Sequence, residues 1–464
     1  MVVASQSHAP LCFYGDDFTG ATAHLAGFHD AGLRTLMFLD TPRPDDLAPH
    51  LGCIDVLGVA GIARALAPDA QAREVRPALE LFAELGARQV HYKVCSTFDS
   101  APDVGSIGLA LEFGREIYAC GPVPIVVGCP GFGRYTMFGN HFARAGAEVV
   151  RLDRHPMARH PSTPMREADL RRHLAAQTAS PLELIDIFAL RAGDSSLAAA
   201  WDRLARAGCA GVVFDTLEDS DLDRIAAFLC THAETAGKPV YSIAAQGLAE
   251  STGRWMAARR DGEASGLAAT RQVPGDVDRM LVLSGSAAAQ NAEQVRRARA
   301  AGWTCLRVDV PRLLEHGIDA LLAPMQAAVD DALRTNGQVL VFTAEGPDDA
   351  AIGQATVSRE ALGVSAEDMS ESIGILFARL ASEALRVHGL RRLVLAGGDT
   401  SSHAMRNFDA YALEIAAKGV GGGRLCRLRS RNPAIDGVEV MLKGGQVGGP
   451  DALVTAASAS AWRP

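Results

Sequence analysis

Residues 393–403, LVLAGGDTSSH, place two glycines, an aspartate and three hydroxyls directly after an apolar run. A strand that ends in glycines at a helix start is suited to an anion, because glycine allows close backbone approach and the helix N-terminus is partly positive. Gly397 and Gly398 would offer backbone N–H groups, and Thr400 would contact phosphate. Asp399 would hold a metal ion or a ribose hydroxyl. The pattern indicates half of a nucleotide site, with ordinary helix capping by Asp or Thr as the alternative.

The same order of residue types occurs near the start of the chain. Residues 11–14, LCFY, precede Gly15, Asp16 and Asp17, and a helix rich in small residues follows. Both aspartates would project from the carboxyl end of a strand, where ligands bind in parallel sheets. One aspartate is enough to cap the helix, so the second indicates a site, and Asp17 is the expected functional carboxylate.

A third polar group follows residues 89–95, QVHYKVC, which alternate with the period of a strand. Lys93 lies near the strand end, followed by Ser96, Thr97 and Asp99. Lys93 would bind a carboxylate or a phosphate, and Asp99 would accept hydrogen bonds from sugar hydroxyls. An exposed lysine followed by a polar turn is the alternative that these residues leave open.

A glycine-rich loop with an arginine follows residues 123–128, VPIVVG. Arg134 in this loop would bind a small carboxylate through two parallel hydrogen bonds. An arginine on a solvated loop is the alternative interpretation.

Two stretches in the second half of the chain resemble phosphate-binding turns. Ser284 and Ser286 end the run MLVLSGS, and their hydroxyls would contact phosphate unless the turn is merely a small-residue joint. Gly444 and Gly445 follow Lys443 in a run that permits close backbone approach to a ligand. Neither GxxxxGK[ST] nor GxGxxG occurs in these stretches, which argues against a P-loop or a dinucleotide fingerprint.

The elements that must position these groups alternate between strand and helix patterns. This alternation predicts an α/β protein with two doubly wound domains, mainly parallel sheets and a cleft between them. A charged stretch with glycine and proline predicts a linker at residues 251–278 between domains at 1–250 and 279–464.

Residues 152–170 are rich in proline and predict an ordered loop over the site. A helix is expected to begin at Pro164 with Thr163 as its N-cap. His155 and His160 in this loop are interpreted as structural, because zinc sites need three or four ligands.

The composition restricts the class of protein. The 464 residues carry a net charge of −9 without a basic stripe, which argues against nucleic acid as the main partner. Nine scattered cysteines without a CxxC pair predict reduced thiols and a cytoplasmic location. Neither a signal peptide nor an apolar stretch of the ~20 residues needed for a membrane span is evident.

Six motifs in order carry a resemblance to a known family. They are GDDFTGA at 15–21, YKVCSTFDS at 92–100, HPSTPM at 160–165, LSGS at 283–286, AGGDTS at 396–401 and LKGG at 442–445. Over nearly its whole length the chain resembles the four-carbon acid sugar kinases, and residues 92–100 look most like the 3-oxo-tetronate kinase branch.

The resemblance implies an N-terminal substrate domain and a C-terminal nucleotide domain. The reaction would move the γ-phosphoryl group of ATP, with Mg²⁺, onto the terminal hydroxyl of 3-oxo-tetronate, threonate or erythronate. By similarity, ATP would contact Ser286, residues 397–400 and Gly444. The resemblance also implies a homodimer.

On this hypothesis the first domain binds the sugar acid. Lys93 and Arg134 would hold its carboxylate, and Asp17 would orient or deprotonate the attacking hydroxyl. Asp99 would bind a neighbouring hydroxyl, and Asp399 would hold Mg²⁺. The full expected set of substrate-binding residues is Asp16, Lys93, Ser96, Thr97, Asp99 and Arg134.

Some turns depart from the usual forms of the family. Residues 244–247 read AAQG, residues 287–289 read AAA, and residues 443–449 read KGGQVGG. A ligand sensor that kept the fold and lost catalysis is therefore a second hypothesis. A dehydrogenase that uses NAD is disfavoured by the missing fingerprint, and the identity and stereochemistry of the acid stay open.

Overall fold

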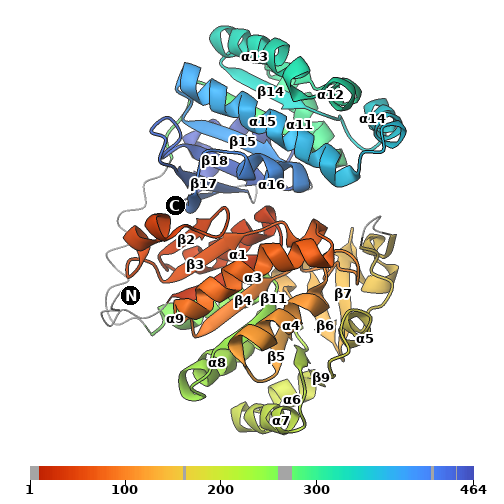
Figure 1. Ribbon diagram of the computed structural model, residues 1–464, viewed down its shortest axis with the longest axis vertical. Helices are drawn as coiled ribbons and strands as arrows, with labels where there is room; N and C mark the ends of the chain where they lie inside the picture. The colour runs from red at the N-terminus through yellow and green to blue at the C-terminus, as the bar shows by residue number, and fades with distance from the viewer. Residues whose placement is uncertain (1–9, 160–162, 260–273, 420–422, 446, 464) are drawn as a thin grey trace. The chain divides into compact units, whose positions relative to one another are not determined.

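The computed structural model describes residues 10–159, 163–259, 274–419, 423–445 and 447–463 (Figure 1). The chain divides into two compact units, residues 1–37 with 41–268 and residues 38–40 with 269–464. Each unit has mainly parallel strands with helices packed on them. The two-domain α/β class is confirmed, and the cleft between the domains stays a prediction.

The sheet of the first unit has the order β2-β3-β1-β4-β11-β5-β10-β9. Its strands are β1 (Leu11–Gly15), β2 (Thr35–Phe38), β3 (Val56–Ala60), β4 (Gln89–Lys93), β5 (Val123–Val126), β9 (Leu182–Ile185), β10 (Gly211–Phe214) and β11 (Val240–Ala244). The winding reverses at β1, because β3 pairs parallel with one edge and β4 with the other. Ligands of doubly wound sheets bind outside the carboxyl ends of strands at such a reversal.

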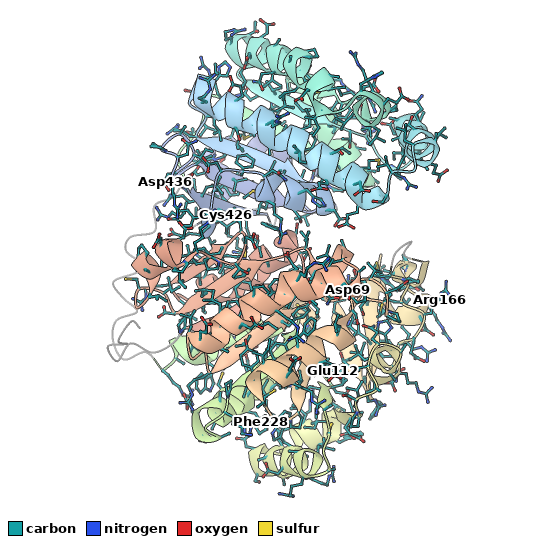
Figure 2. All side chains as sticks on the ribbon, viewed as in Figure 1. Asp69, Glu112, Arg166, Phe228, Cys426 and Asp436 are labelled. Carbon is teal, nitrogen blue, oxygen red and sulfur yellow. The ribbon has the colours of Figure 1, made fainter. Side chains whose placement is uncertain are left out.

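Helices cover this sheet. They are α1 (Phe18–Asp30), α2 (Pro44–Leu47), α3 (Pro68–Glu84), α4 (Ile107–Tyr118), α5 (Leu170–Ala175), α6 (Ile187–Arg191), α7 (Asp194–Arg206), α8 (Asp219–Thr235) and α9 (Gln246–Ala257). Polar side chains on their outer faces include Asp69 of α3 and Glu112 of α4 (Figure 2). Residues 251–257, which the sequence analysis assigned to the linker, belong to α9. Residues 260–273 of the predicted linker lie outside the described residues.

The two faces of β4 explain which side chains reach the site. Tyr92 accepts a hydrogen bond from Gln71 of α3, whereas His91 contacts His24 of α1. Because side chains alternate along a strand, Lys93 shares the α1 face with His91. Burial on both faces also explains why β1 is apolar along its whole length.

A small antiparallel sheet of β6 (Arg134–Met137), β7 (Asn140–Ala145) and β8 (Glu148–Arg151) follows β5. Sequence reasoning expected a loop here and missed these short, half-buried strands. Phe138 and Gly139 form the β6–β7 turn, and their N–H groups donate to the buried carboxylate of Asp215 at 2.7 and 2.9 Å. Asp215 therefore has a structural role.

The helix predicted to begin at Pro164 is wrong. Helix α5 begins at Leu170 with Asp169 as its N-cap. The carbonyl of Ala168 accepts a hydrogen bond from the His141 N–H of β7 at 2.8 Å. The carbonyl of Ala168 is thus paired with strand β7 instead of with a helix that starts at Pro164. The position of a proline in the sequence does not indicate such a contact between distant segments.

The second unit has the strand order β13-β14-β12-β15-β18-β17-β16. Strands β12 (Met280–Ser284), β13 (Thr304–Arg307), β14 (Gln338–Phe342), β15 (Arg392–Ala396) and β18 (Glu439–Lys443) are parallel. Strand β17 (Arg424–Arg429) runs antiparallel to β18 and to β16 (Ala412–Gly419), and β19 (Trp462–Arg463) pairs with β16. The apolar runs that the sequence analysis placed at Ser284 and before Gly397 form β12 and β15.

The helices of this unit are α11 (Ala289–Ala300), α12 (Val310–His316), α13 (Ile318–Thr335), α14 (Ala350–Ala361), α15 (Ala366–His388), α16 (Asp399–Arg406) and α17 (Ala452–Thr455). One core cluster joins α11 and α17 to the sheet through residues such as Val295, Leu453 and Met441. Helix α15 packs against α13 and α16 (Figure 1).

All nine cysteines are free thiols, among them the buried Cys426 of β17 (Figure 2). Within the described segments, none of the helices combines the length and the hydrophobicity that a membrane span requires.

Candidate active site

The carboxyl ends of β1, β3 and β4 bring four charged residues of the first unit together. Asp16 and Asp17 follow β1, Arg64 follows β3, and Lys93 ends β4. The Asp16 N–H donates to the Lys93 carbonyl at 3.1 Å, and the Arg64 N–H donates to the Asp16 carbonyl at 3.1 Å. Three predicted site residues thus lie beside an arginine that sequence reasoning missed.

Arg64 joins the two aspartates. Its Nη2 and Nε donate to the two carboxylate oxygens of Asp16 at 2.6 and 3.2 Å, and Nη2 also donates to Asp17 Oδ1 at 2.9 Å. Both oxygens of Asp16 are therefore engaged inside the protein. The only sequence signal for Arg64 was its place shortly after a parallel strand.

Asp17 is both a helix cap and part of the charged cluster. Its Oδ1 accepts a hydrogen bond from the Gly20 N–H at 3.0 Å, which makes Asp17 the N-cap of α1. The same oxygen lies 3.6 Å from Nζ of Lys93, whose side chain is 2% exposed. The capping and functional interpretations of Asp17 are thus compatible.

The electrostatics of the two aspartates differ. Burial raises the pKa of Asp16. Burial also acts to raise the pKa of Asp17, but the charges of Arg64 and Lys93 outweigh it and lower that pKa below its ordinary value. Asp17 consequently stays a carboxylate at neutral pH and can accept a hydrogen bond from a ligand.

Thr97 and Asp99 lie in the loop after β4 and contact each other, since Thr97 Oγ1 donates to Asp99 Oδ1 at 2.5 Å. Phe98 between them is buried and has a φ of 57°, which is unusual for a residue with a side chain. Ser100 Oγ donates to the Phe98 carbonyl at 3.2 Å and lies 2.9 Å from His173 Nε2. This strained turn holds the two predicted residues together.

Burial acts to raise the pKa of Asp99, but the charge of Arg64 and the hydrogen bond from Thr97 outweigh it and lower that pKa. Asp99 therefore belongs to the same electrostatic cluster as Arg64. Ser96 is half-buried, and its carbonyl accepts a hydrogen bond from His141 if His141 Nε2 carries the proton.

Arg134 begins β6. Its Nη1 donates to two backbone carbonyls of its own loop, and its buried Nε has no partner among the described atoms. Burial lowers its pKa, and the side chain of Cys95 lies within electrostatic range of Arg134 as well as of Arg64 and Lys93. Arg134 therefore adds an incompletely satisfied cation near the cluster.

In the second unit, the predicted ATP-binding residues lie at the carboxyl ends of β12, β15 and β18. Gly397 has a φ of 143°, and its N–H donates to the Lys443 carbonyl at 2.9 Å. Asp399 and Thr400 form the first turn of α16, whose N-cap is Gly398, without a side-chain hydrogen bond. The alternative in which Asp399 or Thr400 caps this helix is therefore wrong.

The three turns contact one another. A β-carbon on Gly445 would lie 2.0 Å from Ser286 Oγ, and one on Gly285 would lie 2.7 Å from side-chain atoms of Thr400. Glycine is required at both positions for this close approach. Ser286, Thr400 and Gly445 are consequently brought together, and their role in binding ATP stays a prediction.

Ser284 differs from the other predicted residues. It is fully buried, and its hydroxyl donates to Asn291 Oδ1 at 3.0 Å. Asn291 in turn donates to the Ser286 carbonyl at 3.0 Å, and Gln294 donates to the carbonyls of residues 447–449 at 2.9–3.3 Å. Sequence reasoning missed these two buried amides of α11, which hold the turns in place.

Asp399 is the carboxylate predicted to hold Mg²⁺. Burial, together with the charges of Asp368, Glu371 and Asp399, raises the pKa of Glu367, so several carboxylates lie close together. The described residues contain no group of three or more His, Cys, Asp or Glu side chains arranged for a metal. This donor set fits Mg²⁺ that arrives with phosphate, since such sites need only one or two carboxylates.

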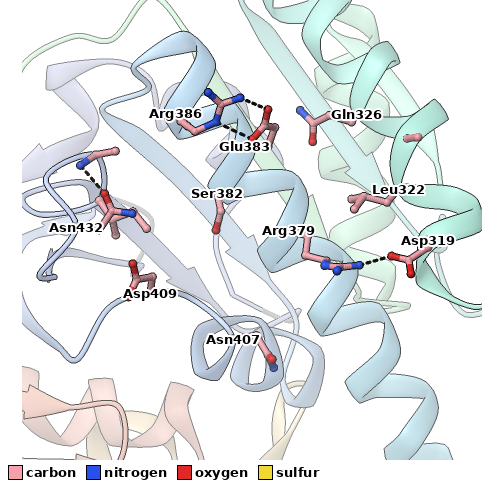
Figure 3. Close-up of a pocket in the computed structure, with 13 residues that line it drawn as sticks. Asp319, Leu322, Gln326, Arg379, Ser382, Glu383, Arg386, Asn407, Asp409 and Asn432 are labelled. Atoms are coloured by element: carbon pink, nitrogen blue, oxygen red, sulfur yellow. Dashed lines mark hydrogen bonds and ion pairs between the residues drawn. The ribbon is translucent and has the colours of Figure 1, made fainter.

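A cavity of about 640 Å³ lies elsewhere in the second unit (Figure 3). Helices α13 and α15 line it, and two ion pairs, Arg379–Asp319 and Arg386–Glu383, lie along its wall. None of the predicted ATP-binding residues lines this cavity. Its volume alone therefore does not identify it as the nucleotide site.

Comparison with known proteins agrees with a first domain for the sugar and a second domain for the nucleotide. A family model described as a sugar-binding N-terminal domain matches residues 11–252, and one described as a nucleotide-binding C-terminal domain matches residues 281–453. A 3-oxo-isoapionate kinase from Paraburkholderia graminis is 38% identical over 451 residues, covering 94% of this chain and 92% of the relative. A 3-oxo-tetronate kinase from Methylobacterium radiotolerans is 31% identical over 439 residues, covering 94% and 96%.

Solved structures share the fold. A protein from Salmonella typhimurium LT2, described as a putative tRNA synthase, has a TM-score of 0.76 at 23% identity and covers 97% of this chain and 98% of its own. A Haemophilus influenzae protein has a TM-score of 0.70 at 22% identity, covering 96% and 99%. With its sugar-binding and nucleotide-binding domains, the chain belongs to the four-carbon acid sugar kinase family and is a sugar-acid kinase.

Proposed function

We propose that this kinase transfers the γ-phosphoryl group of ATP to the terminal hydroxyl of a short 3-oxo sugar acid. The names of the two curated relatives support a 3-oxo acid, and the higher identity to the 3-oxo-isoapionate kinase makes that acid the first to test. The observation that carries the proposal is the charged cluster of Asp16, Asp17, Arg64 and Lys93.

Phosphoryl transfer asks a protein mainly to position reactants and to neutralise charge. Asp17 has a lowered pKa, so it would act first by accepting a hydrogen bond from the attacking hydroxyl. The hydroxyl oxygen forms a bond to the γ-phosphorus, the bond to ADP breaks, and the hydroxyl proton passes to the Asp17 carboxylate. Arg64 and Lys93 would fix the direction of that carboxylate.

The carboxylate of the acid would bind to Arg134. The described part of the chain contains no carboxylate paired with its guanidinium, and its Nε–H is buried without an acceptor, so a ligand carboxylate would satisfy it. Lys93 would add a second positive charge. Ser96, Thr97 and Asp99 would bind the hydroxyls.

Asp16 has a different place in this proposal. Both of its carboxylate oxygens accept hydrogen bonds from Arg64. Asp16 would therefore hold Arg64 in position for Asp17 and would not contact the acid through its carboxylate.

The nucleotide would bind at the turns of the second unit. Backbone N–H groups of residues 398–400, the Ser286 hydroxyl and the close-approach position at Gly445 suit phosphate oxygens. The Gly397 N–H, which the sequence analysis expected to contribute, already donates to the Lys443 carbonyl. Asp399 would hold Mg²⁺, which neutralises charge on the phosphates when bound. The homodimer implied by the family is part of the same proposal, and light scattering of the purified chain tests it.

A coupled assay of ADP release tests the proposed function. The panel contains 3-oxo-isoapionate, 3-oxo-tetronate and both enantiomers of threonate and erythronate, each with ATP and Mg²⁺. We expect one 3-oxo acid to give a higher kcat/KM than the reduced acids. Absence of ADP release with every 3-oxo acid, in a protein that still binds ATP, would reject the proposal.

A further inference from the structure

Lysine is rare in this protein, and its few copies fall into two classes. The sequence holds four lysines: Lys93, Lys238, Lys418 and Lys443. Lys238 and Lys418 are exposed, whereas Lys93 is 2% and Lys443 is 1% exposed. Lysine is seldom fully buried unless a partner compensates its charge. Each buried copy therefore needs an explanation.

The burial of Lys93 is explained by an ion pair. Lys93 Nζ lies 3.6 Å from the Asp17 carboxylate, in the cluster at the sugar-binding end. Lys443 forms no ion pair among the described residues. Its Nζ donates to the neighbouring Gly444 carbonyl at 3.0 Å, and burial alone lowers its pKa to about 8. An ammonium group without a counter-ion is costly to bury.

A buried cation with a purely structural role looks different in the same sheet. Arg392 of β15 is fully buried, and its guanidinium donates to Glu439 and to the carbonyls of Gly275 and Ala456 at 2.6–2.9 Å. Its charge and its donors are thus satisfied within the protein. The surroundings of Lys443 lack that compensation, so a structural role does not account for its charge.

The position of Lys443 indicates what would compensate it. It is the last residue of β18, paired in register with Ala396, and its carbonyl accepts the Gly397 N–H at 2.9 Å. The turn that begins helix α16 therefore starts beside it. Gly445, two residues later, contacts Ser286. Lys443 lies where the turns suited to phosphate converge.

We propose that Lys443 binds the phosphate groups of the nucleotide through Nζ and supplies the positive charge that the surrounding backbone N–H groups lack. This inference rests on the nucleotide site of the proposed function. Phosphate would take the place of the missing counter-ion. Because the amine loses part of its charge near pH 8 without a ligand, a nucleotide that binds there must draw a proton onto Nζ.

Calorimetry with ADP and Mg²⁺, without any sugar acid, tests this at pH 8 in buffers of different ionisation enthalpy. We expect the wild-type protein to take up about half a proton for each ADP bound. The Lys443→Met variant should bind ADP about 10- to 100-fold more weakly and take up no proton, which is the range for a lost hydrogen bond to a charged group. Lys443→Arg should retain affinity without uptake, because arginine stays charged.

Lys238→Met, which changes an exposed lysine of the first unit, is the matched control and should behave as wild type. Binding of ADP to the wild type without proton uptake at pH 8 would overturn the proposal, and this measurement needs no variant that folds. An affinity of Lys443→Met within twofold of wild type would also overturn it. Neither failure affects the sugar-acid proposal, because no acid is present and turnover is not measured.

Discussion

Gly20 and Lys93 leave no space for a methyl group between them. A β-carbon on Gly20 would lie 2.0 Å from Lys93 Nζ and 2.2 Å from Asp17 Oδ1. Helix α1 therefore starts with its backbone pressed against the charged cluster, and the absence of a side chain at residue 20 allows the lysine to reach the aspartate.

Gly20→Ala should displace both charged groups and impair binding of the sugar acid. We expect KM for the acid to rise at least about tenfold, as expected for loss of a charged contact, with ATP binding unchanged. Steady-state kinetics with each substrate varied in turn measure this. Gly121→Ala is the matched control, since its β-carbon would meet no atom within 4 Å. An unchanged KM for the acid in Gly20→Ala would show that the charged cluster does not bind the sugar acid.

Asp17→Asn should reduce turnover by about 10²- to 10⁴-fold, the usual range for a positioned carboxylate in proton transfer. Nucleotide affinity should stay the same, because Asp17 belongs to the sugar-binding domain. Rapid-mix turnover assays and calorimetry with ATP measure the two effects. Asp69→Asn, on the exposed first turn of α3, serves as control. Wild-type turnover in Asp17→Asn would show that Asp17 does not orient or deprotonate the attacking hydroxyl.

Asp399→Ala should weaken binding of ATP in Mg²⁺ but have a smaller effect in EDTA. The reason is that Asp399 would hold the metal, while backbone N–H groups hold the phosphates. Calorimetric titrations in both conditions measure the difference. Asp309→Ala, an exposed N-cap elsewhere in the same unit, is the control. Equal losses with and without Mg²⁺ would show that Asp399 acts on the nucleotide or on the fold.

His173→Leu should raise KM for the sugar acid several-fold without changing kcat or KM for ATP. His173 contacts Ser100, which holds the strained Phe98 turn between Thr97 and Asp99, and one lost hydrogen bond is worth about 1 kcal/mol. His173→Gln, which keeps a polar partner for Ser100, should restore KM. If His173→Leu lowers the thermal stability but leaves KM unchanged, His173 stabilises the fold and does not position the acid-binding turn.

Acid should destabilise the first unit through its buried histidine pair. Burial lowers the pKa of His91 to about 3, and burial also lowers that of His24, its partner at 3.1 Å. Below pH 6.5, the ordinary pKa of histidine, His91 binds a proton in the unfolded chain but stays neutral in the folded one. The free energy of unfolding therefore falls as the pH drops from 6.5 towards 3. At pH 4.5 the loss would be about 2–3 kcal/mol for His91 alone.

Urea unfolding at pH 7.0 and 4.5 measures this loss. The His91→Asn variant should lose less stability between the two pH values than wild type, even if it is less stable at both. His316→Gln, which alters an exposed histidine of the second unit, should follow wild type. An identical pH dependence in His91→Asn would remove His91 as the cause.

Local patterns were sufficient for much of the site. Asp16, Asp17, Gly397 and Gly398 could be located because each follows an apolar run typical of a buried strand, and Lys93 because it ends a stretch with strand alternation. Ends of parallel strands meet at one edge of a sheet. Arg64 also follows a strand, but nothing in the residues around it distinguishes a site arginine from a surface one. Its partners became visible only when β3 and β1 paired.

The amino-acid sequence by itself determined the α/β class, the two domains, the family and the strand ends that carry chemistry, because these depend on short-range periodicity and on motifs. Tertiary structure decided which groups compensate one another. Arg64 joins both aspartates, Asp215 holds the β6–β7 turn, and Lys443 is buried without a counter-ion among the residues that the structure describes. Charge compensation depends on distances between segments that are remote along the chain, and only the folded backbone sets those distances.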